Sequence, residues 1–240
     1  MKKYFTILSL FIGFTICACG QINLNKFKNA AEKAIKGEQP LTNDEIISGL
    51  KEALTVGTNN STASASKMDG YFKNSEIKIP FPPEAVKMEQ KLRSIGMNKQ
   101  VDDFVMSLNR AAEEAAKEAA PIFVTAVKNM TITDGMKILK GEDDAATTYL
   151  KTNTSGQLYD KFKPVVQKAI QKVKVTQYWN PLVTAYNKIP LVEKMNPDIE
   201  DYTTHKGIDG LFILIATEEL KIRKDPAARV SEILKKVFGG

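Results

Sequence analysis

The side chains that could do chemistry are few in this sequence. Its only histidine, His205, lies between Thr204 and Lys206 in a stretch of helical pattern. A lone histidine has no second one with which to bind zinc, and it more often lies at a helix surface than in a catalytic site. No serine stands in the G-x-S-x-G elbow of the α/β-hydrolases. These features argue against protease and hydrolase chemistry, and we expect neither a metal nor a cofactor.

Adjacent carboxylates are the next candidates. Asp143 and Asp144 stand at an expected helix start, where carboxylates accept from free backbone N–H groups and favour the positive end of the helix dipole. Metal binding is the alternative for this pair. Glu113 and Glu114 are neighbours on an expected helix, so their side chains point in different directions and do not form a catalytic dyad by themselves.

Arg110 and Glu114 are four residues apart, opposite the apolar stripe of the same helix. As a surface ion pair they would contribute about 0.3–0.5 kcal/mol. If other helices surround this one on all sides, Asn109, Arg110 and Glu113 become buried instead, and buried charges need partners. Candidate partners elsewhere in the chain are Asp209, Arg223 and Arg229. Such a polar centre would be either a structural lock or the floor of a ligand pocket.

The helix that carries these residues is the longest amphipathic stretch of the chain. From Val101 to Met130 the apolar residues recur at helical spacing, which predicts a central helix. Alanines spread around its middle turns, so neighbours could approach closely on two sides. Pro121 cannot donate to the carbonyl of Lys117, and the helix therefore either kinks or restarts there.

The remaining segments predict a single-domain, all-α bundle of about nine helices over residues 41–240. Thr42 with Glu45, and Thr131 with Asp134, have the spacing of capping boxes. Alternating Ile and Phe among prolines predict one extended arm at about 75–83. Further expected helices span about 42–65, 83–95, 132–139, 176–188, 197–224 and 226–239. A short helix is also expected after Asp143 or Asp144, another capped by Thr154 with Gln157, and Asn98 is expected to cap the central helix.

The N-terminus predicts an address in the bacterial cell envelope. Two lysines precede the apolar run from Tyr4 to Ala18, which is too short to span a bilayer and is typical of a signal peptide at residues 1–18. The residues ICAC match the lipobox, so we expect Cys19 to receive a diacylglyceryl thioether and to anchor a lipoprotein through a tether at 19–40. Gln21 is not the aspartate that favours inner-membrane retention, which indicates the periplasmic face of the outer membrane.

The charge of the chain restricts its partners only mildly. The formal net charge of +6 falls to +4 when Lys2 and Lys3 leave with the signal peptide. Anionic lipid head groups could attract such a chain, but no block of basic residues interleaved with aromatics suggests nucleic acid. We therefore expect the membrane as a partner, with an envelope protein or a small ligand as a further one.

Short blocks spread along the chain resemble a known family. In order they are GLKEAL, DGYFKN, IPFP, LNRAAE, DDAATTY, KFKP, NPDIEDYTT, IDGLF and IRKDPAAR. Together they are similar to DUF4197, an uncharacterised bacterial domain family, over nearly all of Leu41 to Gly239. The resemblance implies a helical, secreted or lipid-anchored domain and transfers no catalytic residue.

Two functions from different classes follow from these features. The first is a non-enzymatic binding or scaffolding module that binds another envelope component, either by protein contact or by holding a small apolar or anionic ligand between its helices. The second is an enzyme of unfamiliar type that uses Glu113, Asp143 or Asp144 with Arg110. Carboxylates that converge on a cleft would favour the enzyme, and a solid core with an exposed apolar patch would favour the binding module.

Overall fold

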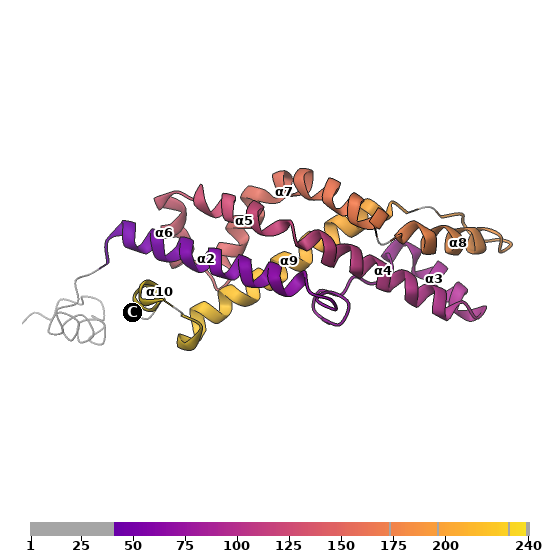
Figure 1. Ribbon diagram of the computed structural model, residues 1–240, viewed down its shortest axis with the longest axis horizontal. Coiled ribbons are helices and arrows are strands. Elements are labelled where there is room, and N and C mark those ends of the chain that lie inside the picture. The colour runs from indigo at the N-terminus through magenta and orange to yellow at the C-terminus, as the bar shows by residue number, and fades with distance from the viewer. Residues whose placement is uncertain (1–40, 173, 196, 230, 239–240) are drawn as a thin grey trace, which may run out of the picture. The chain divides into compact units, whose positions relative to one another are not determined.

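Figure 1 shows the computed structural model of the chain, which describes residues 41–240 apart from 173, 196, 230 and 239–240. The chain divides into two units, Met1–Pro40 and Leu41–Gly240, and the description below concerns the second. The expected signal peptide, Cys19 and the tether lie outside the described residues. Within the described part, no helix has both the length and the hydropathy that crossing a membrane requires.

Residues 41–238 form nine α-helices and two 3-10 turns and, where described, contain no strand. This confirms the expected all-α fold. The first helix, α2 (Asn43–Ala65), begins at the expected capping box of Thr42 and Glu45. It continues through a run of small polar residues because the buried hydroxyls of Ser61 and Thr62 donate to carbonyls one turn earlier.

The expected central helix is in fact two helices, α4 (Asn98–Ala116) and α5 (Ala119–Lys128). Pro121 is the third residue of α5, where a backbone N–H would have no partner within the helix. The chain therefore restarts rather than kinks at this proline. Asn98 does not cap α4, because it is the first helical residue and Met97 before it provides no side-chain cap.

Two expected helices after Asp144 are one helix, α7 (Ala145–Lys172), of 28 residues. Thr154 lies inside it, and its hydroxyl donates to the carbonyl of Leu150 rather than capping a new helix. Pro164 is also inside this helix. Before it, α6 (Ile132–Lys140) begins at the expected capping box of Thr131 and Asp134, which is confirmed.

The other elements lie close to their expected bounds. Gly96 ends the pair formed by η1 (Pro83–Ala85) and α3 (Val86–Ser94), and Asp198 provides the N-cap of α9 (Ile199–Lys224). The remaining elements are α8 (Val175–Asn187), η2 (Pro226–Ala228) and α10 (Glu232–Phe238).

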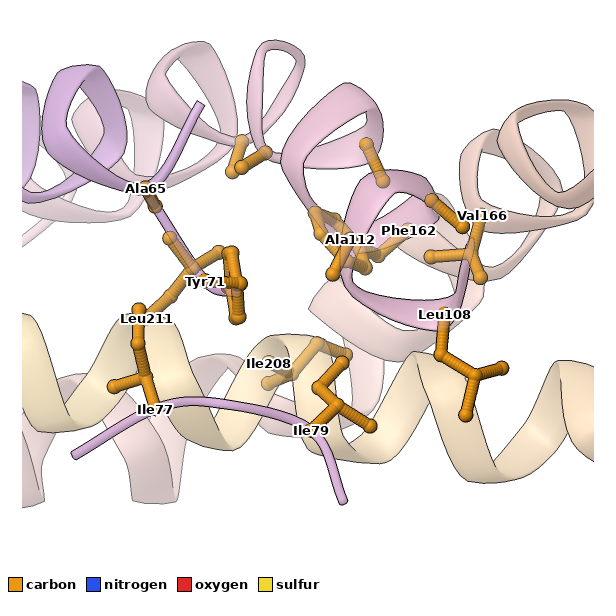
Figure 2. Packing of buried hydrophobic residues seen from close by; sticks show 14 of the residues in the cluster. Ala65, Tyr71, Ile77, Ile79, Leu108, Ala112, Phe162, Val166, Ile208 and Leu211 are labelled. Carbon is orange, nitrogen blue, oxygen red and sulfur yellow. The ribbon is translucent and has the colours of Figure 1, made fainter. Parts of the chain in front are cut away.

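Helix α4 is the most surrounded helix, since it packs against α2, α3, α5, α7, α8 and α9. Four fully buried alanines allow this close approach: Ala111, Ala112, Ala115 and Ala116. Figure 2 shows Leu108 and Ala112 of α4 among Phe162 and Val166 of α7 and Ile208 of α9. On the polar side of α4, Asn109 and Glu113 are therefore buried, whereas Arg110 and Glu114 are partly exposed.

Residues 66–82, here called the connecting segment, join α2 to η1 without any helix. At its end Ile77, Ile79 and Phe81 are buried, whereas Lys78 and Pro80 between them are exposed. This alternation confirms the expected arm, and we call residues 76–82 the arm. Figure 2 shows it passing beside α9.

Two further contacts fix the arm against the bundle. The ring of Phe81 packs edge-on against Phe104, which stacks on Trp179 with ring centroids 4.6 Å apart. The Tyr202 hydroxyl donates to the carbonyl of Pro80 at 3.1 Å. Burial, followed by the charge of Glu84, raises the pKa of Tyr202 to about 12, so this hydroxyl keeps its proton at neutral pH.

Candidate functional site

Helix α4 holds the connecting segment through polar side chains, and Asp69, Arg110 and Glu113 are here called the α4 cluster. Glu113 Oε1 accepts the backbone N–H groups of Tyr71 and Phe72, both at 3.2 Å. Arg110 donates to Glu113 Oε2 and to Asp69 Oδ1, both at 2.6 Å. The Arg110 side chain is 23% exposed and that of Glu113 is 6% exposed. The expected surface pair of Arg110 with Glu114 does not form.

Asn109 extends this set of contacts to the arm. Its Oδ1 accepts from the N–H of Ile79 and its Nδ2 donates to the carbonyl of Ile79, both at 2.8 Å. The Nδ2 group also donates to the carbonyl of Val105. The amide thus replaces the partner strand that an isolated extended segment lacks. Asn109, Arg110 and Glu113 are therefore brought together as the sequence suggests, and their contacts go to the chain's own backbone.

Asp69, the third member of the α4 cluster, is kept ionised by two cationic side chains. Hydrogen bonds from Lys73, then from Arg110, hold the pKa of Asp69 below its usual value of 3.8. Asp69 itself has a left-handed backbone with φ of 68°, a conformation that aspartate adopts more readily than most residues. The turn at Asp69 and Gly70 points the carboxylate toward α4.

A second buried pair, Glu219 with Arg223, lies on α9 and is called the α9 cluster. Glu219 accepts the N–H groups of Ala146 and Thr147 at 2.9 and 2.8 Å, and thereby caps the start of α7. Arg223 donates to Glu219 Oε1 at 2.8 Å and to the carbonyl of Ile138 at the end of α6. One ion pair therefore joins the ends of two helices.

The remaining expected site residues lie outside both clusters or at their edge. Arg229 donates to the carbonyls of Ile222 and Arg223 and meets no carboxylate. Asp143 pairs with the exposed Lys224 at 2.9 Å. Neither Asp209, Arg223 nor Arg229 is a partner of Arg110, because α4 meets the connecting segment at that point. The N–H groups that Asp143 and Asp144 were expected to cap are taken by Glu219 instead.

The best candidate for a binding site is an open groove of about 540 Å³ on α9. Residues 206–216 of α9 form its floor, the arm at 76–80 forms one wall, and residues 144–151 at the start of α7 form the other. Ile213 on the floor is 42% exposed. The apolar run LFILIA at 211–216 predicts a helix segment that is buried on all sides. This prediction is wrong at Ile213, which is exposed and lines the groove.

Six charged side chains line the groove, three of each sign: Glu76, Lys78, Asp144, Lys151, Lys206 and Asp209. None of them forms an ion pair with another described residue. The buried charges of the α4 and α9 clusters, by contrast, are all paired. The groove thus combines apolar surface with charges that form no ion pair among the described residues.

The three carboxylates that the enzyme hypothesis names do not meet at one place. Glu113 is buried and bonded to backbone, Asp143 pairs with Lys224, and Asp144 lines the groove. The described residues hold no group of three His, Cys, Asp or Glu side chains able to bind a metal ion. His205 is exposed, and its Nδ1 lies 3.1 Å from the carbonyl of Asp201.

Fold and site together define, over the described residues, an all-α domain with two ion clusters and a mixed-charge groove. The family model described as "Protein of unknown function (DUF4197)" matches residues 40–239. The chain belongs to this family. No curated protein and no solved structure matches the chain.

Sequence reasoning missed two residues that matter, Asp69 and Glu219. Asp69 precedes a glycine and indicates only a turn, while Glu219 looks like any helical carboxylate. Nothing in a single sequence links either residue to a partner more than forty positions away, as in the bond from Arg110 to Asp69.

Proposed function

We propose that the protein is a lipid-anchored module of the bacterial cell envelope, held by an acylated Cys19 at the periplasmic face of the outer membrane. Its groove binds a segment of another envelope protein, and it carries out no reaction. The lipobox sequence at the N-terminus supports the address. The family match is compatible with this proposal and assigns no activity.

The exposed Ile213 at the floor of the groove is the observation that carries the binding role. Burying its exposed part against a partner is favourable at about 25 cal/mol per Å² of apolar surface. Charges of both signs around it would select a partner by complementarity and reject partners of the wrong pattern. An enclosed small-molecule site would instead surround most of its ligand, which an open groove does not do.

The backbone hydrogen bonds of the arm restrict which kind of protein segment could bind in the groove. The N–H groups of Glu76, Ile77 and Lys78 bond to Asn74, and that of Ile79 bonds to Asn109. Pro80 has none. Residues 76–80 therefore offer no N–H donor to an added β-strand, which argues against strand addition there. A helix, which satisfies its own backbone and presents side chains, fits the groove.

Site-specific photo-cross-linking in cells tests this proposal. A photoreactive residue at Lys151, which lines the groove, should cross-link to one helical segment of an envelope protein. Ile213→Glu should abolish that cross-link, whereas Leu220→Glu should keep it. Leu220 is the matched control because it is 44% exposed on the same helix and does not line the groove.

Each result has a defined meaning. Equal cross-linking in Ile213→Glu and Leu220→Glu would show that the groove does not bind the segment. Cys19→Ala separates the address from recognition, because cross-links that persist without the anchor come from the helical domain. Labelling of the wild type, but not of Cys19→Ala, with a fatty-acid analogue would support lipidation.

A further inference from the structure

Two loops at one end of the described unit present aliphatic side chains to solvent. The turn between α3 and α4 carries Ile95, which is 52% exposed, and the loop between α8 and α9 carries Leu191, which is fully exposed. Figure 1 shows both loops at the end where α3 and α8 terminate, away from the start of α2. Helices α3 and α8 pack against each other and against α4, so the two loops belong to one surface. We call these two loops the tips.

The outward position of Leu191 is built into its loop. The Asn187 side chain donates to the carbonyl of Met195 and accepts its N–H, at 3.2 and 3.1 Å, which closes the loop at its base. Ile189 and Val192 pack against the core, while Leu191 has φ of 64°. A left-handed leucine is strained. The loop thus turns its neighbours inward and its leucine outward.

The other tip is equally defined. Gly96 has φ of 87°, and its N–H donates to the carbonyl of Arg93 at 3.0 Å. The N–H of Met97 donates to the carbonyl of Leu92, and Met97 packs against the core. Ile95 therefore stands at the outside of a short, bonded turn.

The charges around the tips are mainly positive. Lys91, Lys188 and Lys194 are exposed, and none forms an ion pair with another described residue. Arg93 and Lys99 are paired with carboxylates. The only acidic residue within 91–99 and 187–195 is Glu193. The tips therefore combine isolated apolar side chains with free ammonium groups.

We propose that the tips contact an anionic lipid bilayer, with Ile95 and Leu191 entering the head-group region and the lysines meeting lipid phosphates. A protein partner would need pockets that match two separate convex points, whereas a bilayer accepts protruding side chains at any spacing. Shallow apolar insertion combined with basic side chains is the general mode of peripheral membrane binding. This inference does not rest on the proposed function, because neither Cys19 nor the groove takes part in it.

Hydrogen exchange of the full chain on vesicles tests the inference. If the apolar N-terminal run or a lipid attached to it holds the protein on every vesicle, only peptide-level differences report on the tips. Peptides covering 91–98 and 187–195 should exchange more slowly on phosphatidylcholine vesicles that contain phosphatidylglycerol than on phosphatidylcholine alone. Leu191→Ser should weaken insertion roughly tenfold, in proportion to the apolar surface lost, and should remove the slowing at both tips.

The matched control is Ile132→Ser, which changes an aliphatic residue of similar exposure, 48%, at the start of α6. It should leave the slowing unchanged. Equal exchange on both kinds of vesicle, or loss of the slowing in Ile132→Ser as well, would overturn the inference. Slower hydrogen exchange at the tips when a soluble anion is added without vesicles would also overturn the inference. An ion-binding site rather than a bilayer would then explain the effect.

Discussion

The α4 cluster and the α9 cluster are built from the same pair of side chains but hold different structures. In each, an arginine and a glutamate within one helical turn form an ion pair, and the glutamate accepts two backbone N–H groups from a distant segment. Glu113 holds a segment that contains no helix, whereas Glu219 holds the first turn of α7. Glu113 therefore accepts N–H groups that would otherwise bond within a helix or sheet, and Glu219 caps a helix that is already formed.

The difference lies in what remains when the glutamate is removed. Next to the start of α7 lie the exposed carboxylates of Asp143 and Asp144, which could accept from its first turn once Glu219 is removed, although Ala146 and Thr147 are buried. Tyr71, within the connecting segment, is fully buried, and its N–H donates to Glu113 Oε1. Loss of Glu113 should therefore be more severe than loss of Glu219.

Glu113→Ala should have the largest effect. It leaves a buried N–H without an acceptor and removes one of the two carboxylates that neutralise Arg110, and breaking such a buried pair costs about 3–5 kcal/mol. Urea unfolding followed by far-ultraviolet circular dichroism measures this loss. Glu114→Ala is the control, because Glu114 forms exposed pairs with Lys117 and Lys172 worth at most about 1 kcal/mol. Similar losses in the two variants would contradict the account.

Glu219→Ala should cost about 3 kcal/mol, the lower end of the same range, because the buried Arg223 loses its ion pair but keeps its hydrogen bond to the carbonyl of Ile138. Hydrogen exchange should quicken at the first turn of α7 and stay slow at Tyr71 and Phe72. The neighbouring Glu218, which pairs with the exposed Lys221, provides the control variant Glu218→Ala, with little change expected at α7. If Glu219→Ala released the connecting segment instead, the two clusters would be one cooperative unit.

Local patterns were sufficient to predict most of the fold. The capping boxes at Thr42 and Thr131 gave correct helix starts because both partners lie within one turn. The sequence does not decide whether the helix kinks or restarts at Pro121. The two helices predicted after Asp144 are one helix in the structure. Thr154 has the spacing of a cap, yet burial and the bond to Leu150 place it inside α7.

The candidate site shows the opposite balance. Asn109, Arg110 and Glu113 are expected to be buried together if other helices surround α4; Asn109 and Glu113 are buried, whereas Arg110 is 23% exposed. Their partners could not be predicted, because the turn at Asp69 meets α4 only through the path of the whole connecting segment. The groove likewise depends on three segments far apart in sequence, and its charged residues look like ordinary surface charges along the chain.

Tyr71→Phe sharpens the comparison on a smaller scale. The Tyr71 hydroxyl donates to the carbonyl of Gly207 at 2.7 Å in the core, so it joins the connecting segment to α9 as Glu113 joins it to α4. Removing the hydroxyl should cost about 1 kcal/mol, the net value of one hydrogen bond, seen as a lower urea midpoint with unchanged slope. A loss as large as that of Glu113→Ala would mean that the α9 contact, rather than the α4 cluster, holds the segment.

Acid should weaken the α4 cluster through Asp69, with the smallest effect of the series. Because Lys73 and then Arg110 hold the pKa of Asp69 below 3.8, this carboxylate contributes stability above its unfolded pKa and loses it as the pH falls through its folded pKa. The melting temperature, measured from neutral pH to below pH 3.8, should therefore fall less steeply in Asp69→Asn than in the wild type. The variant should already be the less stable of the two at neutral pH. Parallel curves would show that Asp69 is not held ionised by its neighbours, and would leave Glu113 as the only carboxylate that keeps Arg110 in place.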